Sequence, residues 1–396
     1  MMCSFIFRLV SKPHVVFFAF GFTYYLIAPV IIGYSGVFDG YASLEGWYRD
    51  FNNIKSEEIT NYMVIVFVWF ALFIIPSAFV SGKNILISFK DNHKTVSVLM
   101  LLICLSPIVI YTLFSIPALL GGYQSKGFSG KGTIATGSMY ILFFAVYFLV
   151  TGSQKGYLKK SIYLFLMIVT IALLLSGTRM YFVIVFLGLI TNAIFFSRKI
   201  MISYKTVLYA ACLICFVLSI GIFRNGLDKE ITYTGILMVF FMEPMFTWWS
   251  AINDIVYNGF NAIDYPLNFL TSFLNFIPTI LVPSKEELFF KIQDITNFYS
   301  PLGAESIYVS ISANFGYMFG SLYMFFLGLY YALLYKLAKK SLIIRTYYIC
   351  VCVVLPFQFF RDGFEIYNKQ IFSNFLLVPL TILIFIYIFS YFYLYI

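Results

Sequence analysis

Three arginines stand at the ends of apolar runs, where their charge could bind an anion. Arg179 lies in the turn SGTRMY, Arg224 in IFRNG and Arg361 in FFRDG. A guanidinium group binds phosphate through two parallel hydrogen bonds and keeps its charge near neutral pH. Three arginines that lie near one another would therefore favour an anionic group such as a diphosphate as their ligand, although a single arginine at the end of an apolar run can also anchor a helix to lipid headgroups.

Carboxylates accompany these arginines and could act as a general base. Asp362 directly follows Arg361, and Glu305 lies in GAESIYVSISAN, just before an apolar run begins. A carboxylate in a half-buried site can have its pKa raised to suit proton transfer from a hydroxyl group. The stretch around Glu305 fits equally well the start of a helix, with Ser300 as its N-cap or with Glu305 as an acidic residue of its first turn. Glu243 stands inside an apolar stretch, where an unpaired acid is costly, so we expect a basic partner or a water-filled cavity beside it.

The sequence contains no residue set typical of a metal site or of nucleophilic catalysis. The two histidines, His14 and His93, are far apart, and five of the six cysteines lie inside apolar runs. Cys212 and Cys215 have C-x-x-C spacing, but two small apolar residues on one helix face explain that spacing. No P-loop, GxGxxG, HExxH or Ser-His-Asp set occurs. We therefore expect chemistry without a metal or another cofactor.

The composition is that of a polytopic membrane protein. Of the 396 residues, 61% are hydrophobic and 11% are charged, whereas a soluble domain has about 25% charged residues. The net charge of +9 fits the excess of Lys and Arg in cytoplasmic loops. No soluble segment mixes basic runs with aromatic residues, so we do not expect a nucleic-acid partner. At about 20 residues per span, the sequence predicts an all-α bundle of about ten, and up to twelve, transmembrane helices in a single domain over residues 1–396.

Ten apolar runs are long enough to be spans, and the charges between them give an orientation. With the N-terminus in the cytoplasm, the inner segments hold 15 of the 26 basic residues and one of the 17 acidic residues. This distribution follows the positive-inside rule. It places both termini in the cytoplasm and all three arginines at the outer surface. The runs lie near 14–34, 61–81, 95–119, 133–152, 161–177, 180–197, 206–223, 314–335, 342–360 and 371–392.

A large outer segment, about 224–313, separates the seventh run from the eighth. Its stretches 234–252 and 265–283 are apolar enough to touch lipid, and prolines interrupt both. We expect amphipathic or re-entrant helices there, at the outer interface. If both stretches crossed the membrane, the chain would have twelve spans. If only one crossed, the basic cluster at 336–340 would lie outside, which the charge distribution opposes.

The architecture resembles that of the O-antigen polymerases (Wzy), a family of oligosaccharide repeat unit polymerases. The resemblance rests on the turn LLLSGTRMYFVIVFLGLI, on the large outer loop late in the chain, and on GAESIYVSISANFGYMFGSLYMFFLGLYYALL, which closes that loop. It implies a glycosyltransferase-C-like bundle in the bacterial inner membrane with one large periplasmic loop. It also implies transfer of a polysaccharide chain from undecaprenyl diphosphate to a new lipid-linked repeat unit, without a metal or a nucleotide sugar at the site.

The resemblance also implies roles for individual residues and partners. Arg179, Arg224 and Arg361 would bind the diphosphate of the donor or the acceptor and stabilise the charge of the leaving group. Glu305 or Asp362 would be the catalytic base. The implied partners are the undecaprenyl-diphosphate-linked donor and acceptor glycans and membrane lipid, together with a chain-length regulator and a flippase of the same pathway.

The sequence departs from the family pattern in two respects. Some members have an arginine followed eleven residues later by a glycine in two outer loops. Arg224 fits this pattern, with Gly235 at that offset, but Ile190 and Phe372 stand at the same offset from the other two arginines. The related O-antigen ligases use an outer histidine, and this chain has none on the outer face that its charges predict.

A flippase or another transporter of lipid-linked oligosaccharides is the main alternative. A transporter predicts charged residues within the spans, along a central path, and two halves that resemble each other. Here the charges lie mainly at the ends of the apolar runs, and the large outer segment occurs in the second half alone. A third hypothesis, a non-catalytic membrane scaffold, would leave the three arginines unexplained.

Overall fold

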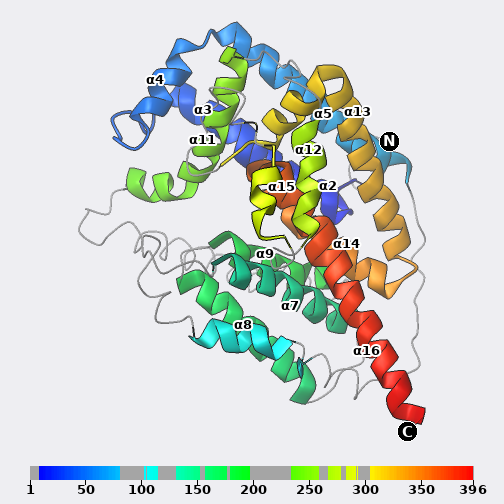
Figure 1. The fold of residues 1–396 in the computed structure, drawn as a ribbon. Helices are drawn as coiled ribbons and strands as arrows, with labels where there is room; N and C mark the ends of the chain where they lie inside the picture. The colour runs from blue at the N-terminus through cyan, green and yellow to red at the C-terminus, as the bar shows by residue number, and fades with distance from the viewer. Residues whose placement is uncertain are drawn as a thin grey trace. The chain divides into compact units, whose positions relative to one another are not determined.

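In this computed structural model, the regular secondary structure of the described residues is helical (Figure 1). One isolated parallel bridge between two residues is the exception among them. The all-α class predicted from the sequence is confirmed for this part of the chain. The structure describes residues 9–80, 102–103, 105–114, 131–151, 157–175, 179–196, 233–257, 266–277, 282–290, 292 and 304–395.

Six helices in the described ranges are long and apolar enough to cross a membrane, which indicates a multi-pass membrane protein. Five of them coincide with predicted spans: Pro13–Ser35, Ser56–Phe79, Ile307–Ala338, Leu342–Phe359 and Gly363–Ile388. Shorter apolar helices occupy parts of four other predicted runs: Leu105–Phe114, Ile134–Val150, Lys160–Leu174 and Met180–Phe196. The predicted run 206–223 lies outside the described residues. The span count and the orientation stay predictions.

The sixth helix, Tyr233–Val256, covers the stretch 234–252, which the sequence placed in surface or re-entrant helices. By length and composition this helix qualifies as a span. The second apolar stretch of the outer segment differs, since its described part folds into α12 (Leu267–Thr271) and the 3₁₀ helix η3 (Ser272–Phe276). Ten helical residues cover roughly 15–20 Å, too short for a hydrocarbon core of about 30 Å. A re-entrant or interfacial position fits that length.

The chain divides into two compact units. The first comprises Met1–Gly82, Glu230–Lys336 and Val354–Lys369, and the second comprises Lys83–Lys229, Leu337–Val353 and Gln370–Ile396. In the second unit α7, α8 and α9 pack against one another, and α16 contacts α7. The bounds of its helices are α7 Lys131–Thr151, α8 Tyr157–Leu175, α9 Arg179–Thr191, η2 Asn192–Phe196, α14 Leu342–Val354, η8 Lys369–Leu377 and α16 Val378–Tyr395.

The first unit contains the elements that position the candidate site. Its N-terminal apolar helix is continuous, with a π-helical turn in the middle, α2–η1–α3, and the connection from α3 to α5 carries the short helix α4. The remaining helices come from the middle and the end of the chain. Their bounds are α2 Pro13–Phe22, η1 Thr23–Ile27, α3 Ala28–Ser35, α4 Glu45–Asn53, α5 Ser56–Phe79, α11 Tyr233–Tyr257, η4 Pro283–Leu288, α13 Ile307–Ala338, η7 Leu355–Phe359 and α15 Gly363–Asn368.

Aromatic side chains fill the core of the first unit. Phe18 of α2 stacks on Phe73 of α5 with ring centroids 3.8 Å apart, and it also contacts Phe360. Gly328 of α13 lies against the backbone of Phe73, where any Cβ would collide with the carbonyl group. Small residues at such points let helices approach closely, which is how helices associate in a membrane. The core therefore holds α2, α5, α13 and the segment around residue 360 in contact.

Candidate active site

Arg361 and Asp362 lie at a break between two long apolar helices. The π-helical turn η7 ends at Phe359, and the amide of Asp362 still donates to the carbonyl of Gln358 at 3.0 Å. Gly363 then has φ of +60° and begins α15. Because a side chain disfavours this left-handed conformation, the glycine of FFRDG permits the turn. The break leaves Arg361 and Asp362 outside the two flanking apolar helices.

The break brings together the two residues that the sequence nominated as catalytic bases. Glu305, which precedes α13, pairs through its backbone with Asp362 in the single parallel bridge. Gly363 makes room for this arrangement, since a Cβ there would lie 3.1 Å from Oε1 of Glu305 and 3.2 Å from Oγ of Ser310. One glycine therefore serves both the turn and the close approach of Glu305.

The carboxyl group of Glu305 is partly buried and accepts a hydrogen bond. Ser310, one turn into α13, donates its hydroxyl hydrogen to Oε1 of Glu305. Burial raises the pKa of Glu305 to about 7; the hydrogen bond from Ser310 opposes this shift, and the nearby charge of Glu365 adds to it. A carboxyl group with a pKa near the working pH is suited to accept and release a proton.

Asp362 has a different electrostatic environment. Its side chain is 12% exposed, and burial raises its pKa to about 6. The guanidinium of Arg361 lowers this pKa and the carboxylate of Glu243 raises it. The pKa of Asp362 therefore depends on how close the guanidinium of Arg361 lies to it. Burial and the hydrogen bond from Ser310 therefore control the protonation of Glu305, whereas the charges of Arg361 and Glu243 also act on Asp362.

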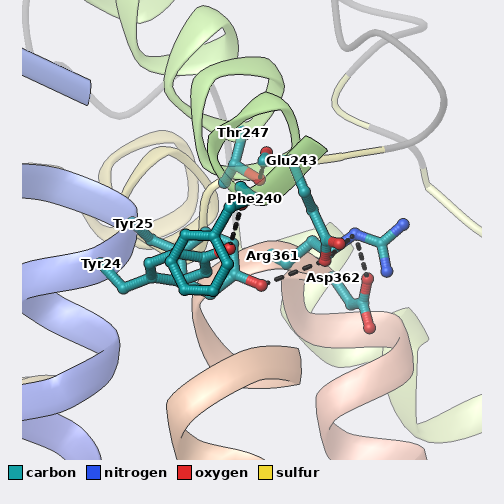
Figure 2. Close-up of polar contacts among 7 residues, drawn as sticks. All are labelled: Tyr24, Tyr25, Phe240, Glu243, Thr247, Arg361 and Asp362. Carbon is teal, nitrogen blue, oxygen red and sulfur yellow. Dashed lines mark hydrogen bonds and ion pairs between the residues drawn. The ribbon is translucent and has the colours of Figure 1, made fainter. Parts of the chain in front are cut away.

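Arg361 forms ion pairs with two carboxylates. Its Nε lies 3.2 Å from Oε1 of Glu243 and 3.7 Å from Oδ1 of Asp362. Figure 2 shows both contacts made through Nε of Arg361. The side chain of Arg361 is 25% exposed and that of Glu243 is 34% exposed. The basic partner that the sequence predicts for Glu243 is therefore confirmed, and it is Arg361.

Two tyrosines of the π-helical turn η1 hold α11 at this point (Figure 2). Tyr25 donates its hydroxyl hydrogen to Oε1 of Glu243 at 3.1 Å. Pro244 has no amide hydrogen for the carbonyl of Phe240, four residues earlier in the helix. The hydroxyl of Tyr24 donates to that carbonyl instead. A proline inside a membrane helix is tolerated where a neighbouring group satisfies the freed carbonyl.

The short helix α4 contacts α11 on the other side of Pro244. The indole of Trp47 donates to the carbonyl of Met245 at 2.8 Å, and Asp50 accepts a hydrogen bond of 2.9 Å from the indole of Trp249. Figure 1 shows α4 beside α11. Glu243 is therefore carried by a helix that is fixed from two sides, which gives Arg361 a defined counter-charge.

Buried amides fix the short helical segment α12–η3 against α13 and α15. The amide of Phe269 donates to Oδ1 of Asn314 at 3.0 Å, and Asn368 donates to Oγ of Ser272 at 2.7 Å. Asn275 donates to the carbonyl of Glu365 at 3.3 Å. These contacts tie the segment to both helices that flank the Glu305–Asp362 pair.

No protein-family model, curated protein or solved structure matches this chain. The chemistry of the site is therefore inferred from its residues and their geometry. Within the ranges that the structure describes, no group of three His, Cys, Asp or Glu residues could hold a metal ion.

The sequence predicted five site residues, and the structure brings three of them together. Arg361, Asp362 and Glu305 lie side by side in the first unit. Arg179 is the first residue of α9, in the second unit, and Arg224 lies outside the described residues. A single site containing all three arginines stays a prediction.

Sequence reasoning missed four residues of the site. Ser310, Tyr24 and Tyr25 are ordinary in membrane helices, and no spacing marks them. Gly363 carried a signal, because a glycine directly after Arg-Asp at the end of an apolar run is typical of a left-handed helix end.

Proposed function

We propose that this protein is a membrane glycosyltransferase that polymerises undecaprenyl-diphosphate-linked oligosaccharide repeat units into a surface polysaccharide. The observation that carries the proposal is the pairing of Glu305 with Asp362 beside Arg361. These groups come from distant parts of the sequence and lie just outside long apolar helices. The family resemblance of the sequence points to the same activity. By that resemblance, the protein works in the bacterial inner membrane, and its donor and acceptor are glycans on undecaprenyl diphosphate.

Each group has a defined part in the proposed reaction. A hydroxyl oxygen of the acceptor sugar attacks the anomeric carbon of the donor, and the bond from that carbon to the diphosphate oxygen breaks. The hydroxyl proton passes to one carboxylate of the Glu305–Asp362 pair, and the diphosphate leaves with the electrons of the broken bond. The terminal nitrogens of Arg361 would bind the leaving diphosphate, where a charge-assisted hydrogen bond stabilises the developing charge.

The pKa values of the pair support the role of a base. At neutral pH a carboxyl group with a pKa of about 7, as in Glu305, is partly ionised and accepts a proton readily. Asp362, with a pKa of about 6, is mainly ionised at the same pH. The two groups together can take up one proton without a metal ion.

A transporter of lipid-linked oligosaccharides is the second candidate, and one observation favours it. Glu243 lies within an apolar helix long enough to span and pairs with Arg361 at a helix break. Charged residues inside spans and interrupted helices are common in transporters. Deleting the gene separates the two functions on a gel of the surface polysaccharide. Lipid A-core carrying one repeat unit indicates loss of polymerisation alone, whereas core without any repeat indicates loss of flipping or ligation.

Point variants test the polymerase site directly. We expect Glu305→Gln, Asp362→Asn and Arg361→Ala each to shorten or abolish the polysaccharide ladder at unchanged protein level. Glu57→Gln is the matched control, because Glu57 is exposed at the start of α5. A normal ladder from all three site variants would refute the proposed active site.

A further inference from the structure

Arg361 is shared between two carboxylates through one nitrogen. Both distances involve Nε, 3.2 Å to Glu243 and 3.7 Å to Asp362. The side chain is a quarter exposed, and Figure 2 shows both contacts made through Nε. The guanidinium group of an arginine is a planar fork that binds phosphate oxygens in pairs. The side chain is thus held at its Nε by two carboxylates, and its contact with Asp362 is the longer of the two.

We propose that Arg361 exchanges Asp362 for a phosphate group of the lipid-linked substrate, and that Glu243 is the positioning residue that holds Arg361 for this exchange. The inference rests on the proposed function, since the anion is the diphosphate of its substrate. Binding of the anion frees Asp362 from its cation, so Asp362 takes up a proton more readily once the substrate is in place. Binding and proton acceptance become coupled through one guanidinium.

The surroundings of Asp362 set the sign of this coupling. Arg361 favours the ionised form of Asp362, and Glu243 favours the protonated form. A phosphate that draws Arg361 away removes the favourable charge and adds a negative one, so both changes raise the pKa of Asp362. Among the residues that the structure describes, the ionisable groups around Asp362 are Arg361 on its own segment, Glu243 on α11 with Tyr25 of η1 behind it, and Glu305 before α13, whose own carboxyl group feels the charge of Glu365 on α15.

Tyr25 supports Glu243 in this role. Its hydrogen bond of 3.1 Å reaches the same oxygen, Oε1, that faces Nε of Arg361. Pro244 follows Glu243 directly, and the contact from Tyr24 to the carbonyl of Phe240 stabilises that turn of α11. Glu243 is therefore oriented by contacts that do not involve Arg361, as a residue that positions another should be.

The test measures the protonation of Asp362 without any need for the glycan substrate. The full-length protein is purified into phosphatidylcholine nanodiscs and treated with a carbodiimide, which modifies protonated carboxyl groups, over pH 5–8. Mass spectrometry then gives the labelling midpoint of Asp362. We expect saturating inorganic pyrophosphate to raise this midpoint by about one pH unit in the wild-type protein. We expect Glu243→Gln to lower it, because Arg361 then directs its whole charge to Asp362.

Controls separate the exchange from its alternatives. Arg361→Gln should raise the midpoint and abolish the response to pyrophosphate, whereas Glu57→Gln should leave both unchanged. A wild-type midpoint that does not respond to pyrophosphate, or a response that persists in Arg361→Gln, would overturn the proposal. A full shift caused by phosphatidylglycerol alone, without pyrophosphate, would also overturn it, because the anion would then be an ordinary headgroup.

The labelling result and the ladder result are independent. If Arg361→Ala abolishes the ladder but pyrophosphate leaves the midpoint unchanged, the exchange is wrong and the polymerase stands. If the midpoint shifts but the ladder of Arg361→Ala is normal, Arg361 binds an anion that polymerisation does not need. In that case the polymerase site is wrong, and the exchange onto a substrate fails with it.

Discussion

Substituting Gly363 by alanine tests the geometry of the site most sharply. Gly363 has φ of +60°, and a Cβ would lie 3.1 Å from Oε1 of Glu305 and 3.3 Å from its Cδ. The left-handed conformation costs a residue with a side chain about 1–2 kcal/mol. Displacing Glu305 also weakens its hydrogen bond with Ser310, which adds about 1–3 kcal/mol, since hydrogen bonds to charged groups lie at the upper end of the usual range.

Gly36 provides a control with the same backbone strain. Its φ is +62°, and no atom lies within 4 Å of the position of a Cβ. Gly36→Ala should therefore lose the backbone contribution alone, about 1–2 kcal/mol, and keep a normal polysaccharide ladder. Gly363→Ala should unfold at a lower temperature than Gly36→Ala in the same detergent and should lose the ladder. Equal unfolding temperatures together with a normal ladder from Gly363→Ala would refute the close packing of Glu305 against the turn.

Two further predictions concern stability. The pKa of Glu305 is raised from 4.5 to about 7. Between pH 4.5 and about pH 7 the folded protein therefore binds more protons than the unfolded chain. The free energy of unfolding falls by on the order of 3 kcal/mol as the pH rises through this range. Melting temperatures at pH 5 and pH 8 should show a smaller fall for Glu305→Gln than for the wild-type protein, and an equal fall would contradict the raised pKa. Tyr24→Phe should cost about 1 kcal/mol in the wild-type protein and less in Pro244→Ala, whose restored amide can bond the carbonyl of Phe240. A double-mutant cycle measures this coupling, and strict additivity would show that Tyr24 does not replace the missing donor.

Long-range features of the site were only partly predictable from the sequence. The acid in an apolar helix required a partner, and Arg361 is that partner for Glu243. Glu305 and Asp362 were both nominated as bases, but their adjacency was not, because no local pattern shows which of two distant segments will pair. The structure brings their backbones together in a single bridge.

The stretch around Pro244 shows why local rules are insufficient. A proline after a charged residue reads as an interruption of the helix, yet α11 continues through it from Tyr233 to Tyr257. The donor that compensates for the missing amide is Tyr24, from the first apolar helix. The apolar helices near the two ends of the chain could be predicted from hydropathy alone, and the structure has long apolar helices at those positions.

The pairing of Glu243 with Arg361 has a consequence for biogenesis. Arg361 is synthesised roughly 120 residues after Glu243, which at about 5–20 residues per second corresponds to on the order of ten seconds. During that interval α11 has been synthesised with Glu243 and Pro244 in its middle, but Arg361 has not. Tyr24 and Tyr25 are synthesised before α11. Their hydrogen bonds to Phe240 and Glu243 can therefore stabilise α11 until Arg361 has been synthesised.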